Sequence, residues 1–346
     1  MLKYSIYPRI YNFLERYDFS SRSERHLSHL NHKKSNSAIP IFLIGFARSG
    51  TTSFQHMISK SFLYNSSFEP IAFNHSNYDE DKFKKISKNF RAAPDYKYKY
   101  QYTIAGKPFS IIHKLKNHSI YNELYFELKE YINHLYNYYG RNVVVKELRL
   151  IPNTITLSKI NNDLDVKPLF ILLKSNPFQI MHTYYRMGGL IEENDINQFR
   201  VNEIYYYRKL SYENLDLFDE ELNIDCNNKY EKLLMSIILD YKYMSILESK
   251  SEINTISMDF LGASNTIEKI SHIIDIPYNE ETLKKISTFE RYRNDKHYVK
   301  NVRKYIRKEL LTIVSKEIFY DLTESSKSDI KYYVTSYRNR ILKNMV

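Results

Sequence analysis

The sequence predicts an α/β protein of three layers, in which helices cover both faces of a central parallel sheet. Short, continuous apolar runs have the length and aliphatic character of strands buried on both faces; they are IPIFLIG at 39–45, NVVVKEL at 142–148 and PLFILLK at 168–174. Between these runs, apolar residues recur every three or four positions, which is typical of amphipathic helices. Strands that alternate with helices specify parallel connections and a doubly wound or P-loop-like sheet.

Further elements follow from the same patterns. We expect helices in three segments with helical spacing, at 53–62, at 119–140 and at 228–249. Gly140 ends the second of them. A second strand is expected to end at SFEP, 67–70, and a further strand lies at 253–261. The remainder of the chain to Val346 is predicted to form charged helices.

The 346 residues divide into an N-terminal helix with a linker, 1–38, and one domain, 39–346. Residues 1–19 predict a short amphipathic helix that packs on the domain, with contact to a membrane surface as the alternative. Charged residues interrupt this stretch, so it is neither a signal core nor a membrane span, and we expect no transmembrane segment. The single cysteine, Cys226, favours a reducing compartment, and we expect a cytoplasmic protein.

The charge balance favours an anionic ligand. Lys and Arg number 51 against 40 Asp and Glu, which gives a net charge of +11. Nucleotides, nucleic acids and acidic glycans all satisfy that balance, and a coding sequence rich in A and T explains it equally well. The basic residues are dispersed and no nucleic-acid-binding motif is present, so we expect no nucleic-acid partner.

The segment GFARSGTTS, Gly45 to Ser53, carries the strongest functional signal. It joins a buried strand to a helix, where backbone N–H groups converge on an anion at the helix N-terminus. Gly45 and Gly50 permit the tight turn, and hydroxyl donors for phosphate oxygens come from Ser49, Thr51, Thr52 and Ser53. The pattern predicts a phosphate-binding loop.

This loop lacks the lysine of an ordinary nucleoside triphosphatase. In a Walker A loop a lysine follows the second glycine, but Thr51 stands there. A cation is present earlier, at Arg48, where it can meet the group being transferred. We therefore keep a P-loop kinase or NTP-dependent phosphotransferase only as the alternative function.

GFARSGTTS resembles the 5′-phosphosulfate-binding loop of the sulfotransferases that use 3′-phosphoadenosine 5′-phosphosulfate (PAPS). The resemblance implies that the chain moves a sulfuryl group from PAPS to an acceptor hydroxyl or amine by in-line displacement. It also implies that Arg48 binds the 5′-phosphate and the bridging oxygen, that the amides and hydroxyls of Gly50 to Ser53 hold the 5′-phosphate, and that no divalent metal is needed.

A second resemblance concerns the 3′-phosphate. The segment LFILLKSNPFQIMHTYYR, 169–186, is similar to the family's Arg-Asp/Asn-Pro motif with its serine six residues later. Thr183 keeps the hydroxyl, but Ser175 stands where the family has its arginine, and both are expected to contact the nucleotide. Lys174, one position earlier, is expected to supply the charge, although neighbouring strand residues point to opposite faces.

In-line transfer needs a base for the acceptor and cations for the charge that builds up. SFEP resembles the Phe-Glu-Pro element of Golgi carbohydrate sulfotransferases, which makes Glu69 the expected base and a carbohydrate or glycolipid the expected acceptor. His75 and His113 are the alternatives for the base. Lys146 interrupts the apolar run NVVVKEL, so its ammonium must reach a polar cleft, where it can contact the sulfuryl oxygens.

Overall fold

The fold is seen in a computed structural model. It describes residues 32–68, 111–148, 150–175, 195–213, 223–259 and 263–278, together with residues 177, 180, 181, 184, 306–308 and 310. The predicted N-terminal helix and the charged segments near Val346 lie outside the described residues.

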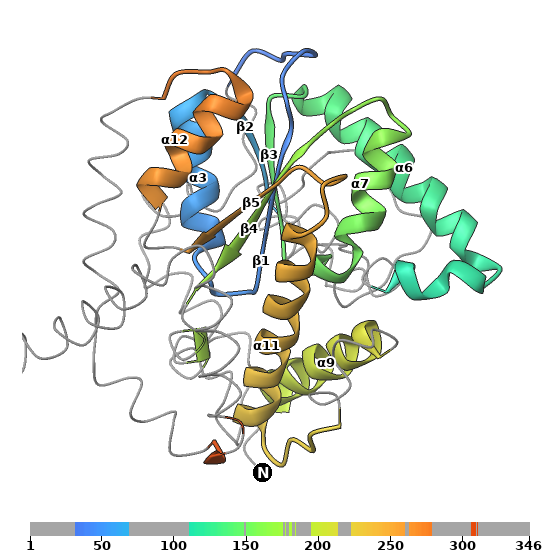
Figure 1. The fold of residues 1–346 in the computed structure, drawn as a ribbon. Coiled ribbons are helices and arrows are strands. Elements are labelled where there is room, and N and C mark those ends of the chain that lie inside the picture. Colours follow the sequence, from blue (N-terminus) through green and yellow to red (C-terminus); the bar gives the residue numbers. More distant parts are fainter. Residues whose placement is uncertain are drawn as a thin grey trace, which may run out of the picture.

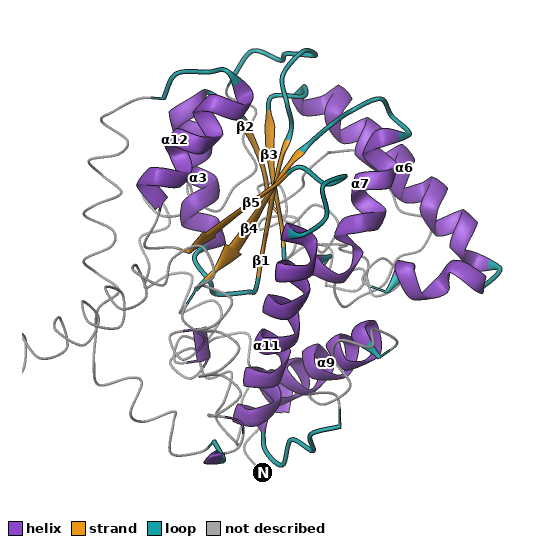
Figure 2. Ribbon diagram, viewed as in Figure 1, coloured by secondary structure: helices purple, strands orange, loops and turns teal. Residues whose placement is uncertain are grey.

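Five parallel strands form one sheet, which confirms the predicted fold class (Figures 1 and 2). The strands are β1 (Ile41–Gly45), β2 (Asn65–Phe68), β3 (Val143–Glu147), β4 (Leu169–Lys174) and β5 (Thr255–Asp259). Their order across the sheet is β2-β3-β1-β4-β5, so the first strand lies at the centre. Each lies within or overlaps a segment in which the sequence predicts a strand.

Helices cover both faces of this sheet (Figure 1). They are α3 (Thr51–Phe62), α6 (Ile120–Tyr139), α7 (Thr154–Asn162), α9 (Asp195–Tyr212), α11 (Lys229–Glu248) and α12 (Ala263–Ile274), and two short 3₁₀ helices are η2 (Ile112–Asn117) and η3 (Ile151–Asn153). The sequence predicts α3, α6, α11 and α12, whereas α7 and α9 are additional. Among the described residues, no helix is both long enough and apolar enough to cross a membrane.

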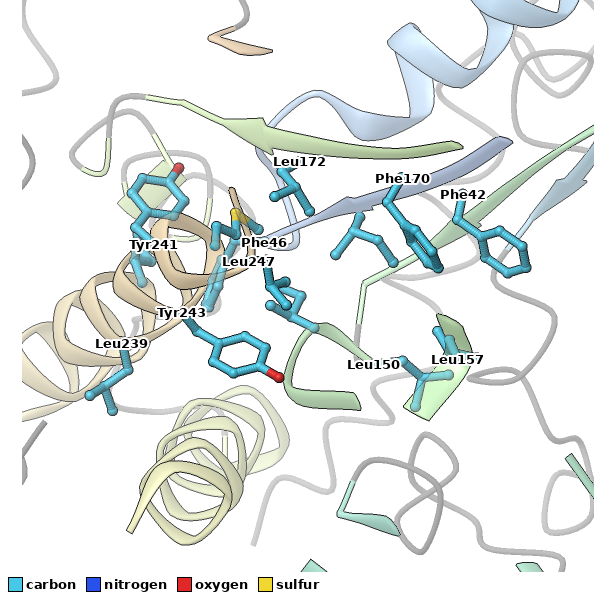
Figure 3. Close-up of a cluster of buried hydrophobic side chains, with 14 of the residues drawn as sticks. Phe42, Phe46, Leu150, Leu157, Phe170, Leu172, Leu239, Tyr241, Tyr243 and Leu247 are labelled. Atoms are coloured by element: carbon cyan, nitrogen blue, oxygen red, sulfur yellow. The ribbon is translucent and has the colours of Figure 1, made fainter. Parts of the chain in front are cut away.

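The alternation of side chains along the strands builds two hydrophobic cores. Ile41 and Leu43 of β1 point to the face that α3 and α12 cover. Phe42 and Ile44 point to the opposite face, where they belong to a cluster with residues of α6, α7 and α11. Figure 3 shows part of this cluster, including Phe42 and Leu157. All of β1 is buried, because a central strand of a three-layer fold has no face in water.

We call the end of the sheet at which the strands begin its amino edge, and the end at which they finish its carboxyl edge. Residues 32–35, which belong to the predicted linker, form hydrogen bonds at the amino edge, at or just before the start of β2 and β3. Asn65 accepts a hydrogen bond from the His32 amide at 2.9 Å, and Asn142 accepts one from the Ser35 amide at 2.8 Å. The Arg141 amide donates to the Ser35 carbonyl at 2.6 Å. These bonds satisfy backbone groups of the linker and the amide of Arg141, just before β3.

The path of the chain marks out the carboxyl end of β1. From β1 the chain passes to the edge strand β2, returns to β3, and then crosses β1 to reach β4 and β5. The connections therefore diverge to opposite sides of β1. In open α/β sheets such a switch point, at the carboxyl ends of the strands, is where ligands bind.

Candidate functional site

The loop after β1 lies at this switch point and forms a tight turn. The Ser49 amide donates to the Phe46 carbonyl at 3.1 Å, and the Phe54 amide donates to the Gly50 carbonyl at 3.1 Å, which begins the hydrogen bonding of α3. Arg48 and Gly50 both have left-handed backbones, with φ of 73° and 99°. Such a conformation is unfavourable for arginine and tends to be found where function requires it.

Gly45 allows the loop to pack closely over the end of β1. A Cβ at this position would lie 2.7 Å from Thr51 Cγ2 and 3.1 Å from the Leu173 carbonyl oxygen. The second contact is with backbone and cannot be relieved by rotating a side chain. The residue type is therefore fixed by the path of the loop and by its approach to β4.

The N-terminus of α3 has the features of an anion site. Among the described residues no side chain caps it, and its first turn contains no acidic residue. The amides of a helix's first turn have no partners within the helix, and the helix dipole places partial positive charge there. An anion bound at this end would receive both the hydrogen bonds and the favourable field.

Arg48 adds a charge at the rim of the loop. Its side chain is exposed. Among the residues that the structure describes, no hydrogen bond or ion pair holds the guanidinium. A strained, exposed arginine beside a helix N-terminus is therefore available to an anionic ligand.

Lys146 brings a second cation to the loop from β3. Lys146 is in register with Leu43 of β1, and its side chain therefore lies on the face of the sheet that α3 covers. The ammonium donates a hydrogen bond to Thr52 Oγ1 at 2.8 Å, while the residue is only 2% exposed. The lysine that interrupts an apolar strand thus reaches the first turn of α3.

Lys174 and Ser175, two adjacent residues at the end of β4, contact different partners. Ser175 Oγ donates to the Ser49 carbonyl at 2.6 Å, so Ser175 contacts the loop after β1. Lys174 Nζ instead lies 3.1 Å from Glu248 Oε1 and donates to Ser245 Oγ at 3.0 Å, both on α11. The expected opposition of adjacent strand side chains is therefore seen.

Several predicted site residues are not placed. Glu69, His75 and Thr183 lie outside the described residues. Ser53 is part of α3, but its side chain is not described. Thr51, by contrast, is described and buried, at the first position of α3. Phe68, which precedes Glu69, ends β2 in register with Lys146.

His113 is held by structural partners. Its Nδ1 lies 2.8 Å from Asn153 Oδ1, and its Nε2 lies 2.8 Å from the Ser211 carbonyl oxygen. Burial lowers the pKa of the imidazole, against the opposing effect of these two hydrogen bonds. Both nitrogens face acceptors, so neither presents a lone pair to a substrate hydroxyl.

Tyr241 on α11 belongs to the surroundings of the loop, although no sequence pattern indicates it. Its hydroxyl accepts a hydrogen bond from the Ser175 amide at 2.6 Å and donates one to the Ser175 carbonyl at 2.6 Å. The chain has 33 tyrosines, and this one stands among the apolar residues of a buried helix. Only the fold shows that it reaches the end of β4.

Comparisons with known proteins give a weak similarity. No protein-family model matches the chain, and no curated protein matches it. Among solved structures, the sulfotransferase domain from the curacin biosynthetic pathway aligns with 72% of this chain and 78% of its own, at 13% identity and a TM-score of 0.36. Within the described part of the chain, no group of three or more His, Cys, Asp or Glu side chains could hold a metal ion.

Proposed function

We propose that the chain is a sulfotransferase that moves a sulfuryl group from PAPS to a hydroxyl or amine of an acceptor, with a carbohydrate or glycolipid as the preferred acceptor. The observation that carries the proposal is the combination at the loop after β1. A helix N-terminus without an acidic side chain lies beside an exposed Arg48, and the Lys146 ammonium lies 2.8 Å from Thr52 Oγ1.

The loop is suited to the 5′ end of the donor. The amides from Gly50 to Ser53 and the hydroxyls of Thr51 and Thr52 would bind the 5′-phosphate. Arg48, at the rim, would neutralise the phosphate and the oxygen that bridges it to sulfur. A sulfuryl donor carries no triphosphate tail, which agrees with Thr51 in place of the Walker lysine.

Transfer requires one bond to form and one to break at sulfur. The acceptor oxygen or nitrogen attacks the sulfur, the bond from sulfur to the bridging oxygen breaks, and adenosine 3′,5′-bisphosphate leaves. The acceptor's proton passes to the base, for which we propose Glu69, with His75 as the alternative. Lys146 and Arg48 would stabilise the negative charge on the transferring and leaving oxygens. His113 is less suited, because each of its ring nitrogens lies 2.8 Å from an oxygen atom of the protein.

The 3′-phosphate is proposed to lie toward Lys174 and Thr183. Lys174 forms an ion pair with Glu248, so it must exchange that partner for the phosphate. The Ser175 hydroxyl is already used by the Ser49 carbonyl. We therefore expect Lys174 and Thr183, and not the Ser175 hydroxyl, to bind the 3′-phosphate.

Binding of the reaction product tests the proposal. Adenosine 3′,5′-bisphosphate should raise the melting temperature in the presence of EDTA, because a ligand that binds only the native state stabilises it, by about 2.7 kcal/mol at a concentration 100 times Kd. Arg48→Ala should lose most of this shift. Arg141→Ala, which removes an arginine at the opposite edge of the sheet, should keep it.

An unchanged melting temperature of the wild-type protein at saturating nucleotide would refute the proposal. Stabilisation by ATP that depends on magnesium would instead assign the loop to phosphoryl transfer. The acceptor can then be sought by incubating the protein with labelled PAPS and a panel of glycans, glycolipids and small molecules. Mass spectrometry should find the label on a carbohydrate hydroxyl or amine.

A further inference from the structure

We infer that Ser175 and Tyr241 are positioning residues that aim the Gly50 amide at the anion bound by the loop. The inference rests on the proposed function and extends it to two residues that touch neither the donor nor the acceptor in this assignment. Neither role follows from the sequence, where Ser175 is expected to contact the nucleotide and Tyr241 carries no signal.

The first step concerns the peptide group between Ser49 and Gly50. Ser175 Oγ donates to the Ser49 carbonyl at 2.6 Å, and Ser175 is only 5% exposed, so water competes little for this bond. A trans peptide is planar, and its C=O and N–H point in opposite directions. A hydrogen bond that fixes the Ser49 carbonyl toward β4 therefore turns the Gly50 N–H away from β4.

The second step concerns the freedom of that peptide. Gly50 has φ of 99°, and glycine adopts several backbone conformations at similar energy. Within the described part of the chain, no hydrogen bond of the Gly50 amide is recorded, and no side chain caps α3. The bond from Ser175 is thus a contact that favours one orientation of this peptide before a ligand arrives.

The third step concerns the support of Ser175 itself. The Tyr241 hydroxyl bonds to both the amide and the carbonyl of Ser175, each at 2.6 Å, and Tyr241 is only 5% exposed. Lys174, one residue earlier, is held by Ser245 and Glu248 of the same helix. Tyr241 lies on α11 within the hydrophobic cluster that includes Leu247 (Figure 3). The end of β4 is therefore fixed to a buried helix, and the serine hydroxyl is held under the loop.

The peptide can be observed directly, because Ser49-Gly50 is the one Ser-Gly pair in the sequence. Protein labelled with carbonyl-¹³C serine and ¹⁵N glycine gives a single correlated NMR signal for this peptide. In the unliganded protein, Ser175→Ala should shift the Ser49 carbonyl resonance upfield, since the carbonyl loses its donor. Ser175→Thr retains a hydroxyl and should restore the wild-type position. An unchanged carbonyl resonance in Ser175→Ala would overturn the inference.

Two nucleotides separate positioning from general destabilisation. Adenosine 3′,5′-bisphosphate has the 5′-phosphate that the loop would bind, whereas adenosine 3′-monophosphate lacks it. Ser175→Ala should weaken binding of the bisphosphate about tenfold, as expected for one misdirected hydrogen bond, and leave the monophosphate unchanged. Tyr241→Phe should give a smaller loss with the same selectivity. Equal loss for both nucleotides, or no loss for either, would overturn the positioning role and leave the proposed function standing.

The two ideas also fail separately. If the wild-type protein binds neither nucleotide, the proposed function is wrong, and titration with inorganic pyrophosphate then decides the inference. A downfield shift of the Gly50 amide proton in the wild type that is lost in Ser175→Ala supports it. No shift in the wild type, or an equal shift in both proteins, overturns it.

Discussion

A single buried lysine illustrates how one residue reports on a site. A charged group that is only 2% exposed needs a polar partner, and Lys146 meets Thr52 Oγ1 at the first turn of α3. The apolar strand around the lysine predicts that its ammonium reaches polar surroundings. What the sequence cannot provide is the partner, because Lys146 and Thr52 are 94 residues apart and are brought together by the order of the strands.

Replacement of Lys146 tests its proposed part in transfer. Lys146→Met keeps the aliphatic volume and removes the charge, and we expect turnover to fall about 100-fold, as when one stabilising donor is removed from a transition state. The affinity for adenosine 3′,5′-bisphosphate should change much less. Steady-state kinetics with PAPS and nucleotide titration measure the two quantities. Equal losses in turnover and in affinity would reduce Lys146 to a binding role.

Ser175 shows where reasoning from a motif fails to give geometry. The sequence places it at the end of a strand, in a segment similar to a nucleotide-binding motif. Whether its hydroxyl points to a ligand or to a backbone carbonyl depends on the close approach of the loop at Ser49. That approach depends in turn on Gly45, which leaves room for the loop beside Leu173.

At the scale of elements, α11 connects the site with the rest of the fold. Its N-terminus is capped by Asn228, whose side chain accepts from the amides of Tyr230 and Glu231. Glu231 accepts from the Asn227 amide and from Arg307 Nε, both at 2.9 Å, and so holds Arg307 against the helix. Farther along, Tyr241 fixes the end of β4.

The cap of α11 predicts a dependence of stability on pH. Burial by itself raises the pKa of Glu231, but hydrogen bonds from Arg307 and the Asn227 amide outweigh it and lower the pKa below its ordinary value. A lowered pKa means that the carboxylate stabilises the fold above its ordinary pKa of about 4.5 and that this contribution is lost as the pH falls through the folded-state value.

Glu231→Gln should therefore lower the free energy of unfolding at pH 7 by about 2 kcal/mol and make it less dependent on pH below 5. Urea denaturation between pH 3 and pH 7 measures both effects. Glu252→Gln, at an exposed position, should match the wild type at pH 7. If the free energy of unfolding of Glu231→Gln depended on pH as steeply as that of the wild type, the role of this carboxylate would be contradicted.

The elements that the sequence does not reveal have polar residues in their buried faces. In α7 the buried side chains include Thr154, Thr156 and Asn161, so no apolar period marks the helix. In α9 the buried Arg208 forms an ion pair with Asp240 of α11, with Nε 2.7 Å from Oδ1. Patterns of hydrophobicity cannot distinguish such a buried charge from a solvated one.

On the scale of the whole molecule, the two ends of the sheet have different surroundings. Its amino edge is closed by the hydrogen bonds of residues 32–35, and its carboxyl edge carries the loop after β1. The apolar runs and their spacing with helices predict the parallel sheet and the three layers. They do not give the order β2-β3-β1-β4-β5, because adjacency between distant strands depends on packing that no local pattern encodes.

Two glycine substitutions test this separation. A Cβ at Gly45 would lie 2.7 Å from Thr51 Cγ2, and one at Gly140, where φ is 82°, would lie 2.9 Å from the Ser35 nitrogen. Both Gly45→Ala and Gly140→Ala should destabilise the fold, by about 1–3 kcal/mol. Only Gly45→Ala should also weaken binding of adenosine 3′,5′-bisphosphate. Comparable nucleotide affinities in both variants, measured by calorimetry below their melting temperatures, would show that the loop tolerates the change.

The closure of the amino edge also provides a place for selective attachment. Ser37 is exposed beside this closure, at the end of the sheet opposite the loop. The single cysteine is Cys226, and burial raises the pKa of its thiol, which slows its reaction with maleimides. A cysteine introduced at Ser37 would therefore couple first to a sensor chip or a bead. The carboxyl edge of the sheet, where we propose that the nucleotide binds, would then point away from the chip or bead.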